Sequence, residues 1–226
     1  MTQETGKPTQ GDWPKMARKL LVATRNPGKA REYRELLREG LPLTVTYLDA
    51  EGLDLEVEES GDTLADNAIL KATAYAQASG LLTWADDSGL EVDALDGGPG
   101  VHSARYAGPG ASDADRRRKL LNALAGVPWE RRTARFRCVV ALAAPEGAVY
   151  TVDGLCEGII AFGPAGNNGF GYDPVFYLPE RGMTMAQLAS EEKNRISHRG
   201  RAAQQAAQML ERSHAGLSGK PAEPDA

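Results

Sequence analysis

Apolar residues along this chain recur in two different periods, and the first half of the sequence alternates between them. Apolar runs of strand length occur over residues 19–24 and 43–48, and a further run over residues 81–85 indicates a short buried strand. Apolar positions at helical spacing follow over residues 30–37 and recur over residues 63–79, where a capping box opens the segment. Strand and helix therefore alternate, which is typical of an α/β protein.

The second half of the chain adds a hairpin to this pattern. Residues 112–126 predict a capped helix, and residues 133–144 and 148–160 predict two strands joined across a Pro-Glu-Gly turn. Thr184 is placed to cap a short helix, and the last helix is expected from Ser197 to about residue 216. We therefore predict an α/β fold with a mixed central β-sheet flanked by helices.

The ends of the chain differ in character from its middle. Residues 1–17 are polar and contain Gly and Pro, which predicts a disordered leader. Residues 217–226 predict a flexible tail for the same reason. The remaining residues, 18–216, are of a suitable length for a single domain with its own core.

The composition is that of a soluble globular protein, with 42% hydrophobic and 25% charged residues. The net charge of −5 argues against a broad surface for nucleic acid, although a small anionic substrate needs only a local positive cluster. The sequence contains neither a signal-peptide core nor a run of membrane-spanning length. We therefore expect a cytoplasmic protein without nucleic-acid or membrane partners.

Two features with reactive or charged groups are expected to be structural. Cys138 and Cys156 lie in strand-like runs without a CxxC partner, which predicts buried free thiols rather than a zinc site. The basic run at residues 116–119 lies on a predicted helix, and charge runs of this kind usually form a solvated face. Neither feature is predicted to bind a ligand.

The first candidate for chemistry is the turn at residues 24–29, Thr-Arg-Asn-Pro-Gly-Lys, between a strand and a helix. Free backbone N–H groups and the helix dipole favour an anion at such a position. The turn is not a P-loop, because the glycine spacing is absent and Ala30 stands where a Ser or Thr would hold magnesium. The structural alternative is a Pro-Gly turn with a surface lysine.

The second candidate is a pair of adjacent carboxylates, Asp86 and Asp87, which follow the strand predicted at residues 81–85. Open α/β sheets place catalytic groups at strand ends, although Asp-Ser-Gly is also common turn chemistry in solvent. Successive strand residues face opposite sides of a sheet, so we expect only one aspartate to enter a cleft. Periodicity alone does not decide which one.

An acidic segment upstream could supply a further carboxylate. Glu56, Glu58 and Glu59 precede a glycine turn. One of them could complete an oxygen-ligand site for Mg²⁺, because hard cations prefer carboxylate oxygens. A solvated acidic loop is an equally good interpretation.

The third candidate is the glycine-rich loop at residues 167–174. Glycines allow the backbone to approach a ligand closely, and Phe170 and Tyr172 offer stacking faces for a base. The alternative is a tight loop whose aromatic rings fill the core.

The fourth candidate is the segment at residues 191–200. Lys193, His198 and Arg199 bring three kinds of hydrogen-bond donor to one helix start. A lone histidine is usually a packing or surface residue. The three groups together suit a phosphate or a purine edge better.

Six segments in this order resemble the inosine triphosphate pyrophosphatase family, which hydrolyses non-standard purine nucleoside triphosphates. Each segment alone is modest evidence, but six in register over about residues 18–212 are very specific. The matching segments are TRNPGK at 24–29, ESGDTLADNAILKA at 59–72, ADDSGLEVDAL at 85–95, PGVHSARYAG at 99–108, GFGYDP at 169–174 and EEKNRISHRG at 191–200.

The resemblance implies a fold of two lobes with the active site in the cleft between them. Members of this family cleave between the α and β phosphates, giving a monophosphate and pyrophosphate. They require Mg²⁺, prefer ITP, dITP and XTP, and are usually homodimers. By resemblance, Asp87 is the general base and a metal ligand, and Glu58 is favoured over Glu59 as the second metal carboxylate. The substrate-binding residues that it implies are Thr24, Arg25, Asn26, Pro27, Gly28, Lys29, Ser88, Phe170, Gly171, Tyr172, Asp173, Lys193, His198 and Arg199.

Two points stay open at this stage. Many family members have Gly where this chain has Arg25, which leaves undecided whether that side chain touches phosphate. The activity also has alternatives: a related nucleotide pyrophosphatase with another base preference, or a nucleotide sensor without catalysis.

Overall fold

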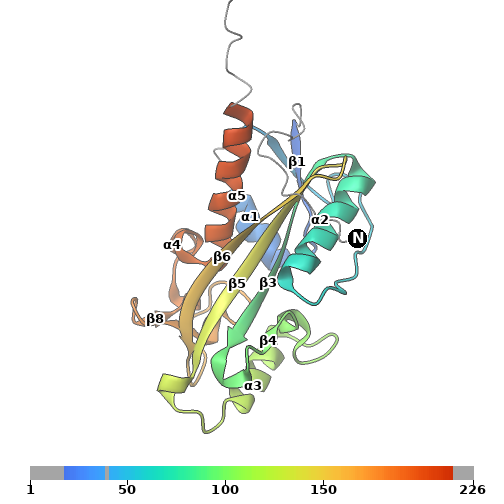
Figure 1. Ribbon diagram of the computed structural model, residues 1–226. Helices are drawn as coiled ribbons and strands as arrows, with labels where there is room; N and C mark the ends of the chain where they lie inside the picture. Colours follow the sequence, from blue (N-terminus) through green and yellow to red (C-terminus); the bar gives the residue numbers. More distant parts are fainter. Residues whose placement is uncertain (1–17, 39–40, 216–226) are drawn as a thin grey trace, which may run out of the picture.

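The computed structural model describes residues 18–38 and 41–215 and has a long, curved β-sheet as its frame (Figure 1). The strands follow the order β2-β1-β3-β5-β6-β7-β8, and β4 pairs with β3 outside this path. β1 is parallel to β2 and β3, whereas the remaining pairs are antiparallel. The predicted mixed sheet is therefore confirmed. The predicted leader and tail lie outside the described residues.

The strand bounds are β1 Lys19–Val22, β2 Thr44–Tyr47, β3 Leu82–Val92, β4 Pro99–Gly100, β5 Thr133–Ala143, β6 Val149–Ile160, β7 Phe176–Leu178 and β8 Met183–Thr184. The α-helices are α1 Pro27–Leu36, α2 Leu64–Ser79, α3 Asp113–Ala123, α4 Ser190–Ile196 and α5 His198–Ala215. Short 3-10 helices are η1 Asp93–Leu95, η2 Ser103–Arg105, η3 Trp129–Arg131, η4 Asp173–Val175 and η5 Met185–Gln187.

Helices cover both faces of one end of the sheet because the strands there are apolar on both sides. On one face, Leu20 and Trp84 form a buried core with Tyr33 of α1 and with α5. On the other face, Leu21 and Ala85 pack with the alanine-rich side of α2. Burial on both faces explains why β1 and the start of β3 are continuous apolar runs.

A second lobe forms where β3, β5 and β6 extend beyond these helices (Figure 1). Its separate core contains Leu90 of β3 and Phe136 of β5, packed with α3 and with the segment from residue 172 to residue 188. The three long strands thus belong to both lobes, which agrees with the two-lobed fold implied by the resemblance. The predicted hairpin is confirmed as β5 and β6, and the helix caps predicted at Thr63, Ser112 and Thr184 are confirmed as capping boxes.

β3 is longer than its apolar run predicts. The pattern predicts an end at residue 85 followed by a Ser-Gly turn, whereas the strand continues through Asp86 and Asp87 to Val92. Residues 83–92 pair with residues 134–143 of β5, and this ladder overrides the local turn preference of Asp-Ser-Gly. The alternative interpretation of Asp-Ser-Gly as a turn in solvent is therefore wrong, and the aspartates lie in the middle of a strand.

Two further expectations concern the cysteines and the membrane. Cys138 and Cys156 are buried and free, as predicted, and burial raises the pKa of the Cys156 thiol to about 11. Within the residues that the structure describes, no helix has the length and apolar character needed to cross a membrane.

Candidate active site

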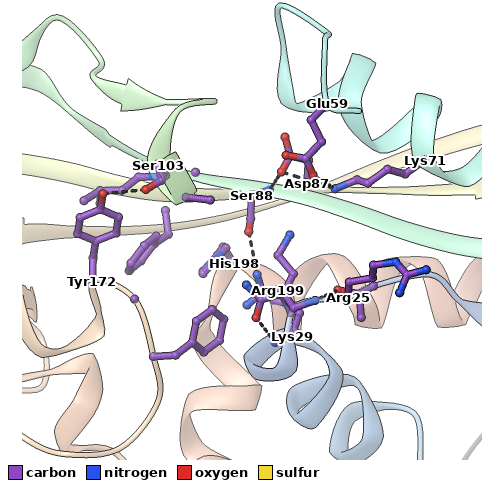
Figure 2. Close-up of a pocket in the computed structure, with 18 of the residues that line it drawn as sticks. Arg25, Lys29, Glu59, Lys71, Asp87, Ser88, Ser103, Tyr172, His198 and Arg199 are labelled. Atoms are coloured by element: carbon purple, nitrogen blue, oxygen red, sulfur yellow. Dashed lines mark hydrogen bonds and ion pairs between the residues drawn. The ribbon is translucent and has the colours of Figure 1, made fainter. Parts of the chain in front are cut away.

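A cavity of about 340 Å³ opens between the two lobes, and residues from distant parts of the chain line it (Figure 2). The predicted site residues in its walls are Thr24, Arg25, Asn26, Lys29, Asp87, Ser88, Phe170, Gly171, Tyr172, Asp173, Lys193, His198 and Arg199. Pro27, Gly28 and Glu58 are not among the lining residues. A Cβ atom on Gly28 would lie 2.7 Å from the Phe170 ring. This glycine therefore allows α1 to contact the glycine-rich loop at residues 167–174, which we name the aromatic loop.

The turn before α1 is arranged differently from the sequence expectation. The Asn26 side chain caps the helix and accepts hydrogen bonds from the backbone N–H groups of Gly28 at 2.9 Å and Lys29 at 3.1 Å. These two N–H groups are therefore already paired, and Pro27 has none. The positive group that the turn presents is instead the Lys29 ammonium, which lies 3.0 Å from Asp86 Oδ2.

The two adjacent aspartates face opposite sides of the sheet, as their positions in a strand require. Asp86 is buried toward α1 and α5, between Lys29 and Arg199, whose guanidinium Nε is 3.4 Å away. Burial alone would raise the pKa of Asp86, but the surrounding cations outweigh it and lower the pKa. Asp87 faces α2 and lines the cavity. The structure thereby decides the choice that periodicity left open.

Asp87 is held by two hydrogen bonds and sits near another carboxylate. Its carboxylate accepts from Asn67 Nδ2 at 3.1 Å and from the Ser88 backbone N–H at 2.9 Å. Burial raises its pKa, with Glu59 and Asp86 adding to the rise against the opposing effect of lysines. A carboxyl with a raised pKa in a cleft is a candidate for proton transfer.

Glu59, and not Glu58, completes this acidic group (Figure 2). The Lys71 ammonium lies 2.5 Å from Glu59 and 3.9 Å from Asp87, so one lysine of α2 joins the two carboxylates. Glu58 is exposed and lies outside the cavity walls, whereas Glu56 and Glu59 are among the lining residues. Glu58 as second metal carboxylate stays a prediction, and Glu59 is the carboxylate that shares Lys71 with Asp87.

Arg25 is directed to the loop that carries Glu59. Its guanidinium Nη2 donates to the carbonyl oxygens of Leu53 at 2.9 Å and Leu55 at 3.1 Å. The Tyr75 hydroxyl donates to the same Leu55 carbonyl at 2.7 Å. Arg25 therefore fastens the acidic loop to the turn before α1.

The opposite wall of the cavity carries the aromatic loop. The half-buried ring of Phe170 lies beneath two cations, with Lys193 Nζ 5.0 Å and the Arg199 guanidinium 5.4 Å from its centre. Tyr172 is buried, and its hydroxyl donates to the Ser103 carbonyl at 2.9 Å, which ties the loop to η2. Of the two predicted stacking residues, Phe170 is thus the less buried.

A buried network of charges supports this wall. Glu32 of α1 lies 2.6 Å from Lys193 Nζ and 2.7 Å from Arg199 Nη1, and Asp173 pairs with Lys193 at 2.5 Å. Burial lowers the pKa of Lys193 and raises that of Glu32, but the ion pairs reverse both shifts. The positive charges are therefore fixed in place by carboxylates from distant elements.

His198 and Ser88 complete the site between the two walls (Figure 2). The His198 ring is buried and stacks on Phe136 with ring centres 4.6 Å apart, and burial lowers its pKa well below the ordinary value. It is therefore a neutral imidazole at pH 7. Arg199 Nη2 donates to the Ser88 hydroxyl at 2.8 Å, so β3 and α5 are joined beside the cavity.

The basic run at the start of α3 is less exposed than predicted. Arg116 lines the cavity, and Arg117 donates to the Gly171 carbonyl, whereas the side chain of Arg118 is 68% exposed. The expectation of a wholly solvated face is wrong because the first turn of α3 faces the aromatic loop.

Sequence reasoning assigned no role to four further residues that shape the site. Asn67 and Lys71 lie one turn apart on α2, and both side chains reach Asp87. Their four-residue spacing within the matched segment at 59–72 indicates that they share one face of the helix. Glu32 stands beside Tyr33 on the buried side of α1, where a charged residue indicates a buried partner. Ser103 also lies in a matched segment, residues 99–108, but no periodic spacing singles it out.

The acidic group has the chemistry of a Mg²⁺ site that a substrate would complete. Within residues 18–38 and 41–215, no cluster of three or more His, Cys, Asp or Glu side chains is placed to hold a metal. Mg²⁺ is commonly bound by one or two carboxylates together with substrate phosphates, and Asp87 and Glu59 provide that number.

Comparison with known proteins gives consistent matches. A model of the Ham1 family matches residues 20–209. A dITP/XTP pyrophosphatase of Desulforamulus reducens is 53% identical over 86% of this chain and 96% of its own length, and that of Bacillus subtilis is 46% identical over 86% and 98%. Among solved structures, a HAM1 protein from Coxiella burnetii superposes with a TM-score of 0.78 at 43% identity, covering 86% of this chain and 98% of the other.

Proposed function

This chain belongs to the Ham1 family, and we propose that it hydrolyses non-standard purine nucleoside triphosphates, namely ITP, dITP and XTP, to the monophosphate and pyrophosphate. One observation carries the proposal: a single cavity has paired carboxylates with lysines in one wall and an aromatic ring beneath fixed cations in the other. The names of the relatives, dITP/XTP pyrophosphatase, support the same activity.

The phosphate chain belongs at the carboxylate wall. Lys29 and Lys71 point into this region, and each is already within reach of an aspartate or glutamate. Phosphate oxygens would add to these contacts, so the lysines offset the negative charge that develops as the α–β bond breaks.

Asp87 is the proposed general base. A water molecule gives a proton to Asp87 and attacks the phosphate chain, the α–β bond breaks, and pyrophosphate leaves. Asn67 and the Ser88 N–H group hold the carboxylate in one orientation during this transfer. In the metal-free protein, burial and nearby carboxylates raise the pKa of Asp87, which is typical of a carboxyl that exchanges a proton.

Asp87 and Glu59 are the proposed ligands of Mg²⁺. Phosphate oxygens of the substrate would complete the coordination of the ion. When bound, the ion offsets phosphate charge in the transition state. The closeness of the two carboxylates, joined here by Lys71, supports this assignment.

The purine belongs at the aromatic wall. Phe170 provides a stacking face, and His198, Arg199 or backbone N–H groups of the loop provide donors for the 6-oxo group that hypoxanthine and xanthine carry. Arg199 is held by Glu32 and Ser88, so its direction is fixed before a base arrives. A buried hydrogen-bonding site of this kind rejects the wrong group, here the 6-amino group of ATP, by up to about 10⁴–10⁵.

A substrate panel tests the proposal and its alternatives. ITP, XTP, GTP and ATP are incubated with the protein with and without Mg²⁺, and pyrophosphate and single phosphate are measured separately. We expect Mg²⁺-dependent pyrophosphate release that is fastest with ITP and XTP. Fastest release from GTP or ATP would indicate another base preference, and binding without turnover would indicate a sensor.

The expected homodimer and cytoplasmic location stay predictions, to be checked by the mass in solution and by cell fractionation.

A further inference from the structure

The first turns of α3 grip the backbone of the aromatic loop at a single residue. Asp113 Oδ2 accepts a hydrogen bond from the Gly171 N–H at 2.7 Å, and Arg117 Nη1 donates to the Gly171 carbonyl at 2.7 Å. Asp113 and Arg117 are four residues apart and therefore lie on one face of the helix. Both polar groups of one residue, between Phe170 and Tyr172, are thus held by one helix.

The backbone conformation of Gly171 makes these two hydrogen bonds important for the residues on either side of it. Its φ of +59° lies in the left-handed region, where only glycine is comfortable, so neighbouring side chains would turn if the residue relaxed. The Phe170 backbone itself has two hydrogen bonds, both to Asp173: its N–H donates to Asp173 Oδ2 at 2.9 Å, and its carbonyl accepts from the Asp173 N–H at 3.2 Å. Both of these bonds stay within the loop, whereas the hydrogen bonds of Gly171 fix the residue next to Phe170 to α3.

α3 is itself anchored to a third segment, which makes the grip rigid. Arg116 donates to the carbonyl oxygens of Ala104 and Ala111, each at 2.8 Å, and forms an ion pair with Asp113. Burial alone would raise the pKa of Asp113, but Arg116 and the Gly171 N–H lower it, so the carboxylate is ionised at neutral pH. The loop and η2 are thereby held in register with each other.

We propose that Asp113 and Arg117 are positioning residues for the purine: they hold Gly171 so that Phe170 presents its ring face to the base. The inference deepens the proposed function and rests on it. It assigns the start of α3 to base affinity and not to phosphate binding, because the Arg117 guanidinium is already committed to a carbonyl oxygen. Asp113 and Arg117 are not catalytic residues.

Adjacent arginines provide a matched test. Arg117→Ala should raise the KM for ITP about tenfold, the usual effect of losing a charge-assisted hydrogen bond, while kcat changes less than about threefold. Arg118→Ala removes an exposed arginine that pairs with Asp115, and should leave both constants unchanged. Arg117→Lys keeps a donor and should restore part of the affinity.

Inorganic tripolyphosphate separates a role at the base from one at the phosphates. Its inhibition constant should be the same for wild type, Arg117→Ala and Arg118→Ala, because it lacks a base. On a Phe170→Ala background, Arg117→Ala should add less than about twofold to the KM, since both act through the same ring.

Three results would overturn the inference: equal KM values for Arg117→Ala and Arg118→Ala, weaker tripolyphosphate inhibition of Arg117→Ala alone, or full additivity with Phe170→Ala. If Arg117→Ala melts early, Asp113→Ala carries the comparison, because it removes the acceptor of the Gly171 N–H, and a wild-type KM for this variant would also overturn the inference. Failure of the wild type to release pyrophosphate would instead contradict the proposed function. Equilibrium binding of ITP to the same variants would still test whether Asp113 and Arg117 position the loop for the base.

Discussion

Asp86 and Asp87 are neighbours on β3, yet their pKa values move in opposite directions. Asp86 faces Lys29 and Arg199, which lower its pKa against the effect of burial. Asp87 faces the other side of the sheet, where burial and nearby carboxylates raise its pKa. Asp86 is thus suited to hold cations in place, and Asp87 to accept a proton.

The raised pKa of Asp87 predicts a shifted carboxyl titration in the metal-free protein. Without Mg²⁺, Asp87 should titrate above the ordinary aspartate value of about 3.9, because burial and nearby carboxylates disfavour its charged form. Lys71 opposes the rise, so Lys71→Gln should move the midpoint of this titration to higher pH. Carboxyl NMR of both proteins without Mg²⁺ measures it, with Asp87→Asn to assign the signal. An unmoved midpoint, or one at lower pH, would contradict the assignment.

At this scale the sequence predicted the kinds of group better than the exact positions. The strand periodicity put Asp86 and Asp87 on opposite faces, but only the neighbouring helices reveal which face is the cleft. Glu59 and Glu58 could not be separated, because the loop that carries them has no regular period, and its direction is fixed by distant residues, Arg25 and Lys71.

Three helices far apart in sequence meet in one buried network of charges. Glu32 belongs to α1, Lys193 to α4 and Arg199 to α5, and all three side chains are nearly inaccessible to solvent. Removing one member of a buried ion group leaves its partners uncompensated. The network therefore couples the stability of the fold to the geometry of the cavity wall that carries Phe170.

Glu32→Gln should destabilise the protein by about 3 kcal/mol, because Lys193 and Arg199 would lose their shared carboxylate. Glu35→Gln, on the exposed side of the same helix, is the control and should cost less than about 0.5 kcal/mol. Denaturant unfolding at pH 7 measures both. Equal small losses would show that the network is not needed for stability.

The loss of stability in Glu32→Gln has a predicted pH dependence. The folded-state pKa of Glu32 is lowered, so its contribution is complete above the unfolded value of about 4.3 and is lost as pH falls through the folded pKa. The stability difference between wild type and Glu32→Gln should therefore shrink in acid. A difference that stays constant down to low pH would contradict the lowered pKa.

Element prediction succeeded where local signals agree and failed where a distant partner decides. The capping boxes of α2 and α3 are encoded within four residues, and both helices begin where those signals predict. β3 passes through a local turn signal because residues 83–92 pair with β5. Similarly, the charge run on α3 indicated solvent, but Arg117 lies against Gly171, which is 54 residues away in sequence.

Across the whole molecule, the lobes contribute different halves of the proposed site (Figure 1). The lobe with α1 and α2 supplies Lys29, Glu59 and Lys71, and the other lobe supplies the loop with Phe170. Asp87 lies on β3, which runs through both. The mixed sheet and the two lobes were predicted, whereas the contact of α3 with the aromatic loop required the three-dimensional structure.

Single-turnover mixing of ITP with excess protein and Mg²⁺ tests this arrangement most directly, with wild type and Asp87→Asn compared side by side. The wild type should form IMP and pyrophosphate in equal amounts without single phosphate. Asp87→Asn should bind ITP about as tightly but form products about 10²–10⁴ times more slowly. Near-wild-type product formation by Asp87→Asn, or release of single phosphate by the wild type, would contradict the account.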